Sequence, residues 1–152
     1  MSLLSPADQQ KLRELFSGMT RSVRLLFFTQ TIGCDTCAET RQILDELPPL
    51  SDRITIEEVN LVLEADKARQ YGIDRAPAVA IAFQDAGDGK TEAPWADSRI
   101  RFLGAPTGYE FVSLAQAVML AGGLPGHLSE RSRQRLAAVD RPVAMQVFTT
   151  PT

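Results

Sequence analysis

Both cysteines of this 152-residue chain lie in one short stretch, Thr31-Ile32-Gly33-Cys34-Asp35-Thr36-Cys37. Residues 23–29, directly before it, are apolar and rich in aromatic side chains, which predicts a buried strand. After it, apolar residues recur at steps of three and four, which predicts one face of a helix over about 34–47. A strand is therefore expected to lead into a loop, and the loop into a helix whose first turn carries both sulfurs.

The position of the two thiols indicates redox chemistry. Free backbone N–H groups and the positive dipole end of a helix stabilise a thiolate, and Cys34, at the start of the helix, gains the most. Cys37, one turn further along, faces the core at a separation that a disulfide tolerates. We therefore expect Cys34 to attack a substrate disulfide and Cys37 to resolve the mixed disulfide.

Composition narrows the class of protein. With 44% hydrophobic and 23% charged residues, the chain resembles an ordinary soluble globular protein. A net charge of −3 gives no support to binding of nucleic acid or of an anionic membrane. No apolar run approaches a membrane span, and Asp8 and Lys11 interrupt the N-terminus before a signal-peptide core could form. We therefore expect a cytoplasmic location, where two such cysteines favour redox chemistry over a structural staple.

Helices and strands alternate through the rest of the chain. Ser5-Pro6 predicts the start of a helix that ends at Gly18. Alternation of strands and helices requires parallel pairing through crossovers, whereas the last two strands form a hairpin. We therefore expect an α/β fold with a mixed sheet and helices on both faces. The further strands are predicted over 54–60, 73–83 and 100–103, and the further helices over 64–71 and 108–121.

Two later motifs make the pattern more specific. The Cys-x-x-Cys motif, followed by Ile73-Asp74-Arg75-Ala76-Pro77-Ala78, resembles the thioredoxin and glutaredoxin superfamily. Residues 100–111, which end in Gly-Tyr-Glu-Phe, are similar to the glutaredoxin-like protein disulfide oxidoreductases, which carry two tandem thioredoxin-fold units. The N-terminal part of the alkyl hydroperoxide reductase flavoprotein shares this tandem layout and is a more distant comparison. The resemblance implies a thioredoxin-like fold with a four-stranded sheet and a thiol–disulfide oxidoreductase.

The resemblance also assigns roles to individual residues. Cys34 matches the nucleophile, Cys37 the resolving thiol and Pro77 the cis-proline of the family. An extended substrate chain is expected to pair with the backbone beside the sulfurs. The residues expected to bind substrate are Gly33, Arg75, Ala76 and Pro77. The implied enzyme needs no bound cofactor or metal, acts on protein disulfides and takes electrons from an external reductase or a small thiol.

Some residues depart from the pattern of the family. Asp35-Thr36 is neither Gly-Pro nor Pro-Tyr, and Phe28 stands at the strand position where thioredoxins have a buried acid. Because these positions influence the redox potential, the sequence leaves the direction of the reaction open among reductase, oxidase and isomerase.

The end of the chain contains a weak internal repeat, and a helix is predicted over 129–139. We expect residues 1–124 to form one thioredoxin-fold unit with its N-terminal helix, and 125–152 to be the helix and first strand of a second, truncated unit. The strand, 143–149, is too apolar for a solvated terminus, so we expect it to pair with this sheet or with another copy of the chain. Three residue identities at a constant offset define the repeat: Val23, Phe28 and Thr29 match Val143, Phe148 and Thr149.

Two alternatives remain open at this level. The chain could be a redox-poor binding module on the same fold, or a dimeric glutaredoxin-like protein that bridges zinc or an iron–sulfur cluster. Structural zinc takes about four ligands, whereas this chain offers two thiols and the distant His127. A metal would therefore have to be completed across a dimer or by glutathione.

Overall fold

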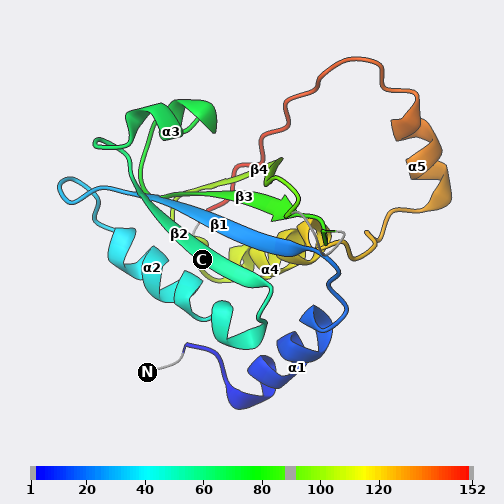
Figure 1. The fold of residues 1–152 in the computed structure, drawn as a ribbon, viewed down its shortest axis with the longest axis horizontal. Coiled ribbons are helices and arrows are strands. Elements are labelled where there is room, and N and C mark those ends of the chain that lie inside the picture. The colour runs from blue at the N-terminus through cyan, green and yellow to red at the C-terminus, as the bar shows by residue number, and fades with distance from the viewer. Residues whose placement is uncertain (1–2, 88–91, 151–152) are drawn as a thin grey trace.

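A four-stranded mixed sheet forms the centre of the protein (Figure 1). The structure is a computed structural model that describes residues 3–87 and 92–150. The strand order is β2-β1-β3-β4, so β1 and β3 are central and β2 and β4 are edges. The expected mixed α/β sheet is confirmed. Its strands are β1 (Ser22–Thr29), β2 (Ile54–Asn60), β3 (Ala78–Gln84) and β4 (Ala96–Leu103).

Strand β1 has one parallel and one antiparallel neighbour. It runs parallel to β2, with Val23 opposite Ile54, and antiparallel to β3, with Phe28 opposite Ala78. Parallel strands need a crossover, and a helix supplies it here, whereas β3 and β4 form an antiparallel pair. Because β1 is covered on both faces, five of its eight residues are buried, as its apolar sequence predicts.

The described residues form six helical segments, and local sequence signals fix several of their ends. Ser5 caps α1 because its Oγ accepts a hydrogen bond from the Asp8 amide at 3.1 Å, and Pro6 takes the first helical position. Ser129 caps α5 in the same way through the Ser132 amide at 3.2 Å. The helices are α1 (Pro6–Phe16), α2 (Cys37–Asp45), the 3₁₀ turn η1 (Pro48–Leu50), α3 (Ala65–Gln70), α4 (Tyr109–Ala121) and α5 (Glu130–Ala137).

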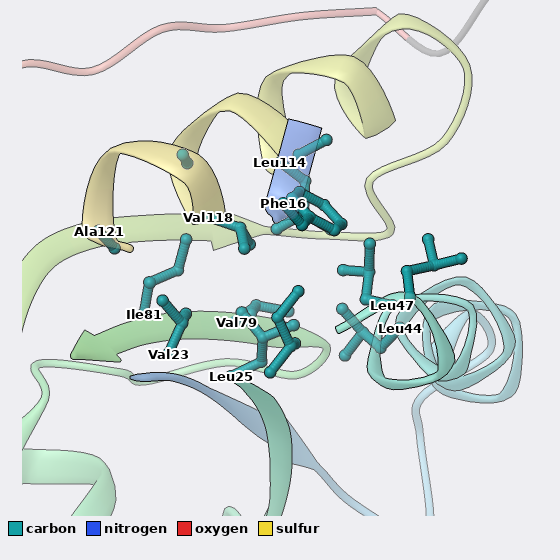
Figure 2. Packing of buried hydrophobic residues seen from close by; sticks show 14 of the residues in the cluster. Phe16, Val23, Leu25, Leu44, Leu47, Val79, Ile81, Leu114, Val118 and Ala121 are labelled. Carbon is teal, nitrogen blue, oxygen red and sulfur yellow. The ribbon is translucent and has the colours of Figure 1, made fainter. Parts of the chain in front are cut away.

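The larger core lies between one face of the sheet and helices α1, α2 and α4 (Figure 2). Alternate residues of β1 and β3 point into it, as the two-residue period of a strand requires. Burial of these side chains supplies the main stabilisation of the fold. The members labelled in Figure 2 are Phe16, Val23, Leu25, Leu44, Leu47, Val79, Ile81, Leu114, Val118 and Ala121.

A smaller core covers the opposite face of the sheet. It contains the other alternate residues of β1 and β3 together with Ala68 of α3 and Ile73. Its members from β3 are small: Ala78, Ala80 and Ala82. Among the described residues, no helix is long and apolar enough to cross a membrane.

The structure differs from the sequence prediction in several places. The strand predicted over 73–83 begins only at Ala78, because residues 73–77 form a loop that ends in the cis Ala76–Pro77 bond. Helix α2 begins at Cys37, so Cys34 lies in the preceding loop and not in the first helical turn. Strand β4 begins at Ala96 because its pairing with β3 continues beyond an irregularity between Ala80 and Ala82. Residues 143–149 form no strand with this sheet, since they are exposed and make no backbone hydrogen bond in the described part of the protein, so the expected pairing within the chain is wrong.

An alternating apolar pattern forms a strand only when its backbone groups find a hydrogen-bonding partner. Residues 143–149 pair with neither edge strand, β2 or β4, and their expected pairing with another copy of the chain remains a prediction. The predicted helix before this segment does form, as α5. The division into units 1–124 and 125–152 remains a prediction.

Candidate active site

The two cysteines lie where β1 gives way to α2. Cys34 is in the connecting loop, Cys37 is the first residue of α2, and the two form a disulfide with a Cα–Cα distance of 5.5 Å. That separation falls in the usual range for disulfides. The pair can therefore alternate between disulfide and dithiol with the backbone in place.

The two sulfurs differ in accessibility. Cys37 is only 8% exposed and belongs to the larger core, whereas Cys34 is half-buried and packs against the edge of that core. A residue in a loop ahead of a helix is also nearer the free N–H groups of the first helical turn. Cys34 is therefore the more accessible of the two cysteines.

Local hydrogen bonds hold the loop in shape. The Gln30 side-chain amide donates to the Gly33 carbonyl oxygen at 3.2 Å. Gly33 has a φ of 75°, a backbone conformation that favours glycine, and it is exposed. After Cys34, the Thr36 carbonyl oxygen accepts from both the amide and the hydroxyl of Thr40, at 2.9 and 2.8 Å. These contacts fix the chain on both sides of Cys34.

The loop over residues 73–77, which we call the proline loop, lies against the larger core through Ala76. The Ala76–Pro77 peptide bond is cis, as the family resemblance implied, and β3 begins directly after it at Ala78. Ala76 packs against the larger core that contains Cys37 and borders Cys34. The Gly104 amide donates to the Pro77 carbonyl oxygen at 2.9 Å, and the φ of 101° at Gly104 suits glycine. Cys34, Cys37 and Ala76 thus all belong to, or pack against, the larger core.

Arg75 is exposed and bound to its neighbour. Its Nε and Nη2 donate to the two carboxylate oxygens of Asp74 at 2.7 and 3.2 Å. The Arg75 hydrogen bond lowers the pKa of Asp74, and the same contact raises the pKa of Arg75. Arg75 thus stands beside the proline loop as half of an ion pair. Its predicted role in binding substrate remains a prediction.

The interior beside the disulfide is apolar. Thr40 is the only fully buried polar or charged side chain in the described part of the chain. Phe28 lies in the smaller core, and Phe27 is the aromatic residue of β1 that shares the larger core with Cys37. No buried carboxylate is therefore available within the described residues to take a proton from Cys37.

The described residues contain no group of three or more His, Cys, Asp or Glu side chains able to hold a metal ion. His127 is exposed and lies after α4 in the segment that leads to α5. The sequence did not predict the roles of Gln30 and Gly104. The Gly-Ala-Pro run after β4 could have indicated a special turn at Gly104, whereas Gln30 carries no comparable signal.

A disulfide at the start of a helix, a cis-proline before an antiparallel strand and a mixed four-stranded sheet together define a thioredoxin-fold thiol–disulfide protein. No family model matches the chain. Its structure is similar to the NTD_N/C domain of the alkylhydroperoxide reductase AhpF from Enterococcus faecalis (V583), with a TM-score of 0.75 and 26% sequence identity. That match covers 91% of this chain and 62% of the other.

Two further relatives agree with this likeness. The alkyl hydroperoxide reductase AhpF of Escherichia coli (strain K12) is 27% identical over 111 residues, which are 73% of this chain and 18% of that protein. A protein disulfide oxidoreductase from Aeropyrum pernix K1 has a TM-score of 0.65 at 22% identity, over 88% of this chain and 54% of the other, and supports the fold alone. The fold is thus thioredoxin-like and similar to the NTD_N/C domain of AhpF, and the chain spans less than two thirds of the length of each of these relatives.

Proposed function

We propose that this chain is a dithiol–disulfide oxidoreductase that acts on protein disulfides. The observation that carries the proposal is the Cys34–Cys37 disulfide, in which Cys34 is accessible and Cys37 is 8% exposed. An accessible thiol backed by a second thiol in the core suits two successive exchange steps.

The reaction begins from the reduced protein. The Cys34 thiolate attacks one sulfur of the substrate disulfide, forms a bond to it and releases the other substrate sulfur as a thiolate. The Cys37 thiolate then attacks the Cys34 sulfur, which forms the intramolecular disulfide and releases the second substrate thiolate. Two electrons pass from the protein dithiol to the substrate, and the released thiolates take up two protons from solvent in proportion to their pKa values.

The backbone of Ala76 is suited to hold an extended substrate chain. Ala76 packs against the same core as Cys34. Within residues 3–87 and 92–150, the Ala76 amide and carbonyl have no hydrogen-bond partner. A substrate segment can pair with them as an added strand. In this proposal Gly33 leaves room beside Cys34, Pro77 shapes the turn, and Arg75 borders the approach.

The electron source lies outside the chain. Because the dithiol itself carries both electrons, the proposed reaction uses no bound cofactor or metal. A reductase or a small thiol would return the disulfide to the dithiol. We place the protein in the cytoplasm, where such reductants keep thiols reduced.

Reduction of insulin by dithiothreitol, followed by turbidity, tests the proposal. The wild-type chain should accelerate precipitation of the insulin chains, and Cys34→Ser should abolish the acceleration. Equal rates with and without the wild-type chain would overturn the proposal. That result, together with stoichiometric metal in the purified protein, would favour the binding-module or cluster-bridging alternative.

The direction of the reaction needs a second measurement. Equilibration of the Cys34–Cys37 pair with glutathione buffers gives its reduction potential, read as the fraction of protein that resists alkylation. A potential near that of thioredoxin, about −270 mV, indicates a reductase, whereas one near −120 mV indicates an oxidase.

A further inference from the structure

A cavity of about 310 Å³ lies between three segments that are far apart in the sequence. They are the residues before α1, one face of α2, and the loop that leads from β4 into the first turn of α4. Cys34, Ala76 and Pro77 do not line it, although α2 begins at Cys37. The cavity is therefore separate from the candidate active site. Its volume lies near the lower end of the range for small-molecule sites, about 300–1,000 Å³.

One part of the cavity lining is apolar. Ile43 of α2 is 6% exposed, and Leu4 and Phe111 pack against the larger core. Pro106, in the loop before α4, is buried as well. Leu3 also lines the cavity and is exposed. An apolar ligand gains free energy when it leaves water to contact side chains of this kind.

The polar part of the lining is rich in hydrogen-bond acceptors. Glu39, Gln42 and Glu46 recur at steps of three and four, so they lie on one face of α2. The chain before α1 runs beside this helix (Figure 1), and the Leu3 amide donates to Glu46 Oε1 at 2.8 Å. Within residues 3–87 and 92–150, the side chains of Glu39, Gln42 and Thr107 make no hydrogen bond or ion pair. These groups are therefore free to bind a ligand.

No basic side chain neutralises the two carboxylates at the cavity. None of the described residues that line it is a lysine or an arginine. Arg41, the one basic residue of α2, is bonded elsewhere, because its Nε donates to Asp45 at 2.8 Å and its Nη1 donates to Glu58 of β2. The charge of the lining is thus complementary to a cation.

We propose that this cavity binds a small organic cation, which consists of an ammonium group on a compact apolar body. The apolar body lies against Ile43 and Phe111, and the ammonium group donates to the carboxylates of Glu39 and Glu46. An ammonium group has three donors and no acceptor, which suits a lining of carboxylate oxygens. A volume near the lower limit for such sites favours a free small molecule over a peptide segment. Binding at this site does not depend on thiol–disulfide exchange.

Three probes that share a phenyl ring and differ in charge test the proposal. Phenethylamine, phenethyl alcohol and phenylacetate are each titrated into the oxidised wild-type protein, and binding is followed in amide NMR spectra. The protonated amine should bind with a Kd on the order of 1 mM and should shift the amides of Gln42, Glu46, Thr107 and Phe111. The alcohol should bind about fivefold more weakly, because it forms no ion pair. Phenylacetate should cause no shift at these amides.

A pair of matched variants tests the role of the carboxylates. Glu39→Gln should weaken binding of phenethylamine about threefold and leave binding of the alcohol unchanged. Glu14→Gln removes the same charge from an exposed position of α1 and should bind the amine as the wild type does. The amide spectra also establish that both variants remain folded.

Several results would overturn the cation site. They are equal affinity for the amine and the alcohol, equal weakening by Glu39→Gln and Glu14→Gln, and no amine-induced shift at the four amides up to about 10 mM, tenfold above the expected Kd. Any of these leaves the proposed function intact, because the titrations use oxidised protein and no thiol reacts. Conversely, a protein that failed to reduce insulin but bound the amine as described would retain the cation site alone.

Discussion

Arg101 donates a hydrogen bond to each carboxylate oxygen of Asp97, from Nη1 to Oδ1 at 2.8 Å and from Nη2 to Oδ2 at 2.6 Å. Its Nε donates to the Tyr71 carbonyl oxygen at 2.9 Å, and its guanidinium lies 5.4 Å from the centre of the Tyr71 ring. Arg101 therefore joins edge strand β4 to the end of α3. The chain that follows α3 leads directly into the proline loop, so this contact supports one side of the candidate active site.

The Asp97–Arg101 pair predicts a dependence of stability on pH. The hydrogen bond from Arg101 lowers the pKa of Asp97 from its ordinary value of 3.8. A lowered pKa stabilises the fold above the ordinary value, and that contribution is lost as the pH falls through the lowered one. Because the pair is partly exposed, we expect Asp97→Asn to reduce the free energy of unfolding by only about 0.5–1 kcal/mol at neutral pH.

Urea unfolding of the wild type and Asp97→Asn at a series of pH values measures this effect. The difference between the two proteins should be largest at neutral pH and should shrink as the pH falls below 3.8. Asp52→Asn, in the exposed turn before β2, is the control and should show little change. A difference that grew toward acid pH would contradict the prediction.

The two thiols should react at different rates in the reduced protein. Cys34 is half-buried in a loop, whereas Cys37 is 8% exposed in the larger core. We expect iodoacetamide to modify Cys34 at least about tenfold faster than Cys37 near neutral pH, because reactivity requires both thiolate and access. Mass spectrometry of the proteolytic peptides gives the order of modification.

The same assignment predicts which variant traps a substrate. Cys37→Ser should accumulate a mixed disulfide between Cys34 and insulin, because the resolving thiol is missing. Cys34→Ser is the matched control and should trap none. Faster modification of Cys37, or trapping by Cys34→Ser alone, would reverse the roles of the two residues.

Helix α1 should be an integral part of the fold. Phe16 is completely buried in the larger core with Leu114 of α4 (Figure 2), whereas the adjacent Leu15 is 43% exposed. We expect Phe16→Ala to cost about 3–5 kcal/mol of unfolding free energy, and Leu15→Ala about 0.5 kcal/mol. Chemical unfolding of both variants makes the comparison within one helix. Similar losses would show that α1 is only loosely attached.

The C-terminal segment should exchange its amide hydrogens freely. No backbone hydrogen bond in the described residues involves 140–150, and their side chains are exposed. We expect these amides to exchange at the rate of an unstructured peptide, whereas those of β1 should be protected close to the limit set by global unfolding. Hydrogen–deuterium exchange read by mass spectrometry compares the two segments. Slow exchange over 143–149 would indicate that the segment pairs with another copy of the chain.

The helices and strands that were predicted well are those specified by residues close together in the sequence. Strand β2 spans Ile54–Asn60 as its short apolar pattern indicated. The helix that follows Ser5 and the helix predicted over 129–139 also form close to where they were expected, as α1 and α5. These signals depend on residues close together in the chain. The Cys34–Cys37 pair is of the same kind, because its spacing alone brings the sulfurs within bonding range.

Features that depend on distant partners were harder to predict. The apolar alternation of 143–149 has the pattern of a strand, but forming one requires pairing with an edge strand, and these residues pair with neither β2 nor β4. The start of β4 at Ala96 depends on register with β3 across a bulge. The outward position of Val62 and Leu63 depends on the bonding of Asn60, and their hydrophobicity alone would have predicted burial.

The single tryptophan of the chain gives the Arg24–Trp95 contact a practical use. The Arg24 guanidinium lies 4.0 Å from the centre of the Trp95 ring, and Trp95 packs against the smaller core. Trp95 precedes Ala96, which pairs with Phe83 near the first residues of β1, whereas the disulfide follows the last residue of that strand. Indole fluorescence therefore reports the packing of the sheet end remote from the sulfurs. The same fluorescence signal can therefore be used to follow unfolding of both the oxidised and the reduced protein, because the redox change itself does not contribute to it.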